Sequence, residues 1–153
     1  MGLHKMSNTR MRAWFAVVIW AIAGVGFFVT FFSGGGPGEF ANDSMRHLAG
    51  AGALGFGFLG YWLALWFTRQ RKGAPRVSDE RDMHVVARAN QATLVVVLVG
   101  IYVFTIGLWT VYETSGQVPV GWMWFLAYGS VILASVTSAV VILVLDGRMG
   151  GHE

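Results

Sequence analysis

The sequence predicts an all-α, polytopic membrane protein with four transmembrane helices. Hydrophobic residues make up 55% of the 153 residues and charged residues only 12%, whereas a soluble domain usually carries about 25% charged residues. The mean hydropathy of the chain is +0.57. Each of four apolar stretches is long enough to cross a hydrocarbon core of about 30 Å, which needs roughly 20 helical residues. We therefore expect residues 1–153 to form a single domain with spans near 13–32, 48–68, 89–112 and 120–145.

The first span follows three basic residues, Lys5, Arg10 and Arg12. Basic residues before an apolar run are also typical of secretory signal peptides, but their apolar core has only about 7–15 residues and ends at a cleavage site of the Ala-x-Ala type. The run at 13–32 is longer, and no such site follows it. We interpret this segment as an uncleaved signal anchor.

The second span carries small residues at helical spacing. They recur every three or four positions and form one stripe along the predicted helix: Ala49, Ala53, Gly57, Gly60 and Ala64. Small residues let two membrane helices approach closely. The stripe is explained either by packing inside the four-helix bundle or by a docking surface for another subunit.

The third span has polar residues before it that extend its helical pattern. Ser78 can cap a helix, and acidic residues follow it in the first turn, where the helix dipole favours negative charge. A helix from there to Tyr112 would be about 50 Å long, which exceeds the hydrocarbon core. We expect it to project into the cytoplasm and to offer candidate partner-binding residues: Asp79, Glu80, Arg81, Asp82, His84 and Arg88. The alternative is a solvated helix end whose charges pair with one another.

The same segment resembles a known kind of protein. Asp79-Glu80-Arg81-Asp82, followed by Ala87-Arg88-Ala89-Asn90-Gln91, is similar to the Asp-Glu-Arg signature of small predicted four-helix membrane proteins of unknown function. In those proteins the signature lies in the central cytoplasmic loop before the third span. Some are encoded beside small helix-turn-helix regulators, so the resemblance implies a regulatory or sensing role. It implies no catalytic residues.

The fourth span has a second small-residue stripe, which includes Ser130, Ala134 and Ser138. The serine hydroxyls can also form hydrogen bonds between helices. As for the second span, internal packing and subunit docking both explain the pattern.

Basic residues are distributed unevenly about the spans, and this predicts the topology. Ten of the eleven Lys and Arg residues lie before the first span, between the second and third spans, or after the fourth, and only Arg46 lies on the other side. By the positive-inside rule, both termini and the central loop are cytoplasmic, so we expect a multi-pass protein of the cytoplasmic (inner) membrane. We attribute the basic cluster to orientation and attraction to anionic membrane lipids, and we expect no nucleic acid as a partner.

Several functional classes lack the residues they need. The chain has no cysteine, and no Asp or Glu lies inside a predicted span. Ion-coupled carriers usually keep an ionisable group in the membrane, so a small transporter is disfavoured. The four histidines lie at different predicted depths; His47 alone is a candidate for a haem, a pigment or a quinone, and we expect no metal site and no cofactor.

Two functions remain, and we expect no enzyme activity under either. In the first, the protein regulates or senses through protein–protein contacts of its cytoplasmic helix extension, with another protein or a second copy as partner. In the second, it is an accessory subunit of a larger energy-transducing or pigment-containing membrane complex. The sequence favours the first but identifies no partner.

Overall fold

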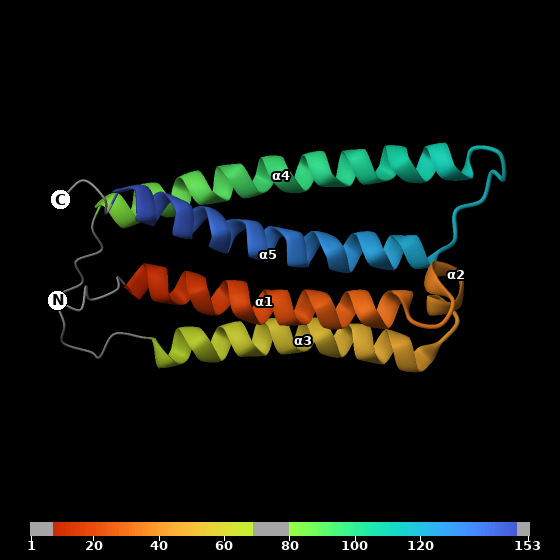
Figure 1. Ribbon diagram of the computed structural model, residues 1–153, viewed down its shortest axis with the longest axis horizontal. Helices are drawn as coiled ribbons and strands as arrows, with labels where there is room; N and C mark the ends of the chain where they lie inside the picture. Colours follow the sequence, from red (N-terminus) through yellow and green to blue (C-terminus); the bar gives the residue numbers. More distant parts are fainter. Residues whose placement is uncertain (1–7, 69–79, 150–153) are drawn as a thin grey trace.

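The structure is a computed structural model that describes residues 8–68 and 80–149. It is all-α, as predicted, and comprises α1 (Asn8–Phe32), α2 (Gly36–Phe40), α3 (Ser44–Phe67), α4 (Glu80–Tyr112) and α5 (Gly121–Met149) (Figure 1). The four long helices each contain a segment long and apolar enough to cross a membrane: Thr9–Phe32, Ser44–Phe67, Met83–Tyr112 and Gly121–Gly147. This confirms the predicted class of a small four-span membrane protein.

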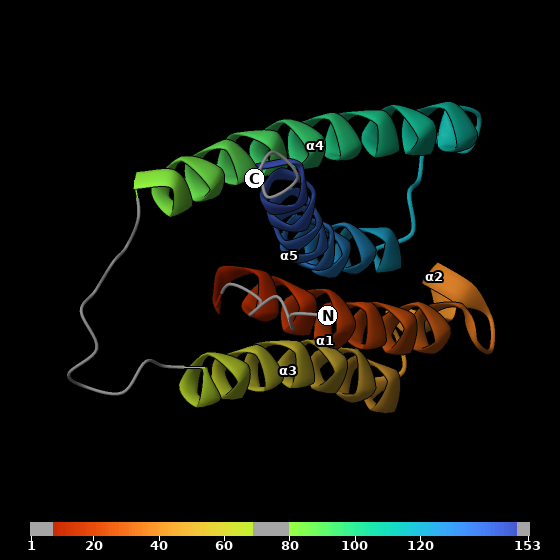
Figure 2. The same ribbon diagram turned by 60° about the vertical axis from the view of Figure 1, so that its left-hand side comes forward.

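The four long helices form an open bundle with two inner and two outer members. The inner helices α1 and α5 pack on each other, α3 packs on the outer side of α1, and α4 packs on the outer side of α5 (Figure 2). The outer helices α3 and α4 have no comparable contact with each other in the described residues. We call the end where α1 and α4 begin and α3 and α5 end the basic end, and the opposite end, which holds α2, the turn end (Figure 1).

At the turn end, local sequence determines how α1 leads into α3. Gly34, Gly35 and Gly36 have φ angles of 78°, 113° and 69°, values that favour glycine because it has no Cβ. Pro37 stands in the first turn of α2, a position where its fixed φ angle suits a helix. A short helix, α2, thus forms between the glycine turn and the start of α3.

Asp43 explains why α3 begins before the expected span. Its carboxylate accepts hydrogen bonds from the backbone N–H groups of Met45 at 2.9 Å and Arg46 at 3.3 Å. These are donors that the first turn of a helix cannot satisfy internally. The cap allows α3 to start at Ser44.

Close packing of α3 on α1 depends on glycine. A Cβ atom on Gly57 would lie 2.7 Å from the Trp20 ring, and one on Gly60 would lie 3.1 Å from Ile19. The Trp20 ring also meets Phe58 edge-on, with ring centroids 5.1 Å apart. Dispersion contacts of this kind drive helix association in lipid.

The inner helices meet through small and aromatic side chains. Ala16, Trp20, Ala23 and Ala139 form one buried cluster between α1 and α5. A Cβ on Gly24 would lie 3.1 Å from Ile132 in this interface. Leu133, the next residue of α5, packs against α4. A Cβ on Gly100 of α4 would lie 3.1 Å from the Leu133 side chain. These contacts place Gly24 and Gly100 at a similar level of the bundle.

Candidate functional site

The turn end is closed by an aromatic cluster contributed by four helices. Phe31 is fully buried, and its ring centroid lies 4.9 Å from that of Phe40 in α2 and 4.9 Å from that of Phe125 in α5. Phe104 brings α4 into the cluster by stacking on Phe125 at 5.4 Å. Packed aromatic rings leave little space here, so this end offers a rigid support rather than a cavity.

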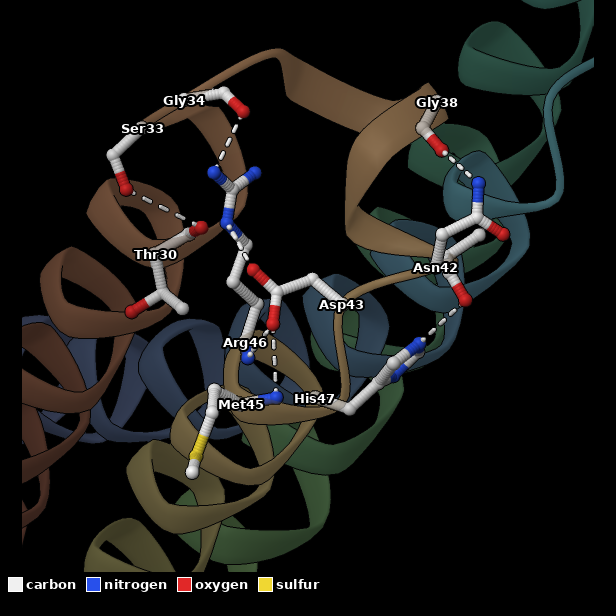
Figure 3. Close-up of polar contacts among 10 residues, drawn as sticks. Thr30, Ser33, Gly34, Gly38, Asn42, Asp43, Met45, Arg46 and His47 are labelled. Carbon is white, nitrogen blue, oxygen red and sulfur yellow. Dashed lines mark hydrogen bonds and ion pairs between the residues drawn. The ribbon is translucent and has the colours of Figure 1, made fainter.

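A polar network covers the α1–α3 connection (Figure 3). The Arg46 guanidinium pairs with Asp43 at 3.2 Å and donates to the Gly34 carbonyl oxygen at 2.6 Å. Its Nη1 atom is buried and has no hydrogen-bond partner among the described residues. The network holds the glycine turn against the start of α3.

His47 is held in this network by its ring. Nε2 lies 3.3 Å from the Ala41 carbonyl oxygen, and because a carbonyl can only accept, Nε2 carries the hydrogen. The ring packs between Phe40 at 4.7 Å and Trp124 at 4.9 Å. In this arrangement His47 ties the connection between α2 and α3 to α5.

The basic end is hollow. A cleft of about 770 Å³ runs between the outer helices, with α1 and α5 as its floor. That volume is within the range of about 300–1,000 Å³ that is typical of small-molecule sites. Its lining comes from all four long helices and is mostly apolar, and it includes Arg12, Trp20, Tyr61, Asn90, Thr93 and Ser138.

Three polar side chains in the cleft have no hydrogen-bond partner among the described residues. Within the described part of the chain, the hydroxyls of Tyr61 and Ser138 and the side-chain amide of Asn90 make no hydrogen bond. Two further hydroxyls donate to their own helix, Thr93 to the Ala89 carbonyl at 2.7 Å and Ser135 to the Val131 carbonyl at 2.8 Å, and keep oxygen lone pairs to accept bonds. The cleft therefore offers both donors and acceptors within apolar walls.

Arg12 lies at the mouth of the cleft and closes the end of α3. Its Nε donates to the Thr68 hydroxyl at 3.0 Å, and its Nη2 donates to the Thr68 carbonyl oxygen at 2.9 Å. Thr68 is buried and also donates from its hydroxyl to the Ala64 carbonyl at 2.7 Å. Because a guanidinium has five N–H donors, Arg12 keeps three for another acceptor.

The proposed partner-binding segment lies partly outside the described residues. Asp79 falls outside them, and for Glu80, Arg81 and Asp82 the structure describes only their place in the first turn of α4. His84 and Arg88 are exposed, whereas Val85 and Ala89 are buried. Because α4 packs chiefly on α5, which continues to Met149, the first turns of α4 are supported on one side rather than free.

The two small-residue stripes lie in different surroundings. In α3, Gly57 and Gly60 contact α1, Ala53 lies near Gly26, Ala64 is half-buried and Ala49 is exposed. In α5, Ala134 and Ser138 line the cleft, and the Ser130 hydroxyl donates to the Ala127 carbonyl at 2.9 Å.

The sequence did not reveal the cleft, although it held a signal for it. Tyr61, Asn90 and Thr93 are polar residues within or next to apolar spans, and polar groups at such positions often line cavities. Tyr61 lies on α3, whereas Asn90 and Thr93 lie on α4. These two helices face each other across the cleft without extensive contact, so only the arrangement of the helices brings the three residues to one site.

Comparison of the chain with protein-family models, with curated proteins and with solved structures finds no match. The similarity to membrane proteins with an Asp-Glu-Arg signature therefore stays a hypothesis. The geometry of the helices defines a four-span membrane protein with a closed turn end and a hollow basic end.

Proposed function

We propose that this protein is a small multi-pass protein of the cytoplasmic membrane that acts by binding another protein rather than by catalysing a reaction. The recognition element is the start of α4, and its role is regulation or sensing, in keeping with the similarity of residues 79–82 to the Asp-Glu-Arg signature. The observation that carries the proposal is the two-sided character of this segment: Val85 and Ala89 are buried, while His84 and Arg88 are exposed. A helix held on one side can present the other in a defined orientation, which lowers the entropic cost of binding.

The proposed orientation follows from charge. Arg10, Arg12 and Arg88 all lie at the basic end, while Arg46 lies at the turn end. The positive-inside rule then assigns the basic end, and with it both termini, to the cytoplasm. The start of α4 is accessible to a cytoplasmic partner in this orientation.

The absence of a catalytic role is also part of the proposal. Among the described residues that line the cleft, Arg12 and Tyr61 are the ionisable ones. Acid–base catalysis needs a group that exchanges protons near neutral pH, typically a histidine or a carboxylate. This composition supports binding.

Photo-crosslinking tests the proposed function. A benzoylphenylalanine at exposed position Ala87 is expected to give one discrete adduct in native membranes, whose mass identifies either another protein or a second copy of this chain. His84→Ala/Arg88→Ala should reduce the adduct by about fivefold or more, corresponding to a loss of roughly 1 kcal/mol. Arg10→Ala removes a charge at the same end on α1 and should leave the adduct unchanged. Equal adduct yield from all three proteins, or no adduct from the parent, would refute the proposal.

The open arrangement of the helices favours a second function, in which the protein is an accessory subunit of a larger membrane complex. Each outer helix packs chiefly on one neighbour, and the faces of α3 and α4 carry many exposed apolar side chains, including Phe58, Trp62, Leu98 and Tyr102. A larger assembly would cover such faces. Co-migration of the protein with a stable complex in mild detergent would support this alternative, and a lone monomer or homodimer would oppose it.

A further inference from the structure

We propose that the cleft at the basic end binds one anionic glycerophospholipid from the adjacent leaflet, with the phosphate at Arg12 and the ester groups at Tyr61 and Ser138. This inference rests on the cleft alone and does not depend on the proposed protein partner. Its support is a match between the depths of polar groups in the cleft and the layers of a phospholipid.

The apolar lining of the cleft limits what can fill it. At roughly 30 Å³ per molecule, about 25 waters would be needed to fill 770 Å³. Most of the lining is apolar, including Ala13, Phe58, Leu94 and Val97, and water in contact with such walls is unfavourable. Because α3 and α4 have no extensive contact, the cleft is open towards the surrounding lipid. A lipid chain can fill the apolar part without this cost.

Two polar groups, Arg12 and Asn90, face each other across the mouth of the cleft. Gly24 and Gly100 contact adjacent residues of α5 and so lie at one level. At 1.5 Å per residue, Arg12 is about 18 Å from Gly24 along α1, and Asn90 is about 15 Å from Gly100 along α4, both towards the basic end. Arg12 and Asn90 therefore lie at similar depth on opposite sides of the mouth, where a guanidinium and an amide can both donate to a phosphate.

Two further polar groups, Tyr61 and Ser138, lie deeper in the cleft. Arg12 is bonded to Thr68, and Tyr61 is seven residues from Thr68, about 10 Å along α3. Ser138 is next to Ala139, which packs with Ala16 and Trp20 at this deeper level. The headgroup and interfacial layer of a bilayer is about 5–8 Å thick on each side of the hydrocarbon core. At about 10 Å below Arg12, the hydroxyls of Tyr61 and Ser138 thus lie just past this layer, at the inner edge where the ester-linked acyl chains begin below a phosphate anchored at Arg12.

The lipid also supplies hydrogen-bond partners that the cleft groups lack among residues 8–68 and 80–149. An unpaired polar group in the membrane costs free energy until it finds a partner. In the proposed complex, ester oxygens accept hydrogen bonds from the hydroxyls of Tyr61 and Ser138, and phosphate oxygens accept hydrogen bonds from Arg12 and Asn90. The acyl chain lies along Trp20 and Phe58. The charge of Arg12 favours an anionic lipid over a neutral one.

Native mass spectrometry of the full-length protein tests the proposal, with delipidated protein titrated with phosphatidylglycerol, dioleoylglycerol or inorganic phosphate. The parent protein should retain one phosphatidylglycerol, whereas dioleoylglycerol lacks the phosphate and inorganic phosphate lacks the chains, so neither should be retained. Arg12→Gln and Tyr61→Phe/Ser138→Ala should each weaken retention of phosphatidylglycerol by about tenfold. Arg12→Lys keeps the charge and should recover part of the loss.

A matched double variant controls for general effects. Tyr102→Phe/Ser130→Ala removes the same atoms from α4 and α5 outside the cleft and should bind like the parent. Unchanged binding of phosphatidylglycerol by Tyr61→Phe/Ser138→Ala would overturn the proposal, because surface charge alone would then explain its retention. This outcome is decisive even if Arg12→Gln fails to fold or binds weakly. Equal retention of phosphatidylglycerol and dioleoylglycerol would overturn the proposal as well.

Discussion

The turn end and the basic end of the bundle share the four long helices, but α2 is added at the turn end and the two ends are packed with different side chains. At the turn end, Phe27, Phe31 and Phe40 are buried and bring α1 and α2 together with α5. At the basic end, the inner helices present Ala13, Ala16 and Ala134 to the space between α3 and α4. Large rings fill the turn end, whereas small side chains on α1 and α5 leave a cleft at the basic end that the rings of Trp20 and Phe58 border. Helix spacing along one bundle is therefore set locally by side-chain size.

The contrast separates the parts of the protein that provide stability from those that can bind. At the turn end several polar side chains bond within the protein: Trp122 donates to the Tyr112 hydroxyl at 3.0 Å, and Arg46 and His47 secure the connection before α3, while the buried Nη1 atom of Arg46 has no partner among the described residues. At the basic end, Tyr61, Asn90 and Ser138 still lack partners in the described residues. Unpaired polar groups beside a cavity are expected where a ligand binds.

Removing the central ring of the turn end should produce the largest effect. Phe31→Ala deletes a side chain with no exposed surface, and truncation of a buried Phe commonly lowers the free energy of unfolding by about 3–5 kcal/mol. The midpoint of thermal unfolding in detergent measures the loss. Phe15→Ala is the control, since Phe15 is 45% exposed and should tolerate truncation. Similar midpoints for both variants would show that the aromatic cluster does not hold the bundle.

An added side chain at the α1–α3 contact should produce an intermediate effect. Gly57→Leu places atoms within 2.7 Å of the Trp20 ring, and overpacking of this kind costs about 1–3 kcal/mol. Gly52→Leu lies on the same helix where no atom is within 4 Å of an added Cβ. Denaturant titration of both variants measures the difference. If Gly57→Leu is as stable as Gly52→Leu, α1 and α3 do not pack as described.

Loss of the Thr68 hydroxyl should produce the smallest effect and should be confined to the basic end. Thr68→Val removes the acceptor of the Arg12 Nε donor but leaves the carbonyl that bonds Nη2. The expected cost is about 1 kcal/mol, and hydrogen exchange should increase mainly in the last turn of α3. Thr105→Val, whose hydroxyl donates to the Ile101 carbonyl on an exposed face of α4, provides the comparison. Faster exchange at the turn end in Thr68→Val would contradict the independence of the two ends.

Some parts of the candidate sites could be read from the sequence, while others could not. The polar start of α4 was apparent because acidic and basic residues interrupt an apolar pattern before residue 89. The Asp43 cap precedes α3 in the sequence and could have been recognised from its residue type. The Arg12–Thr68 contact could not, since 56 positions separate the two residues and no local pattern connects them.

The apolar pattern of the sequence was enough to predict an all-α protein with four helices that can span a membrane. The reason is that the hydrocarbon core accepts only long apolar segments whose backbone hydrogen bonds are satisfied internally, and each such segment is visible in the chain. Only the tertiary structure decided that α1 and α5 lie inside, that α3 and α4 stay apart, and that a cleft opens at the basic end. Helix order depends on how side chains far apart in the sequence fit together, and the fit of Gly57 to Trp20 or of Phe104 to Phe125 exists only once the helices meet.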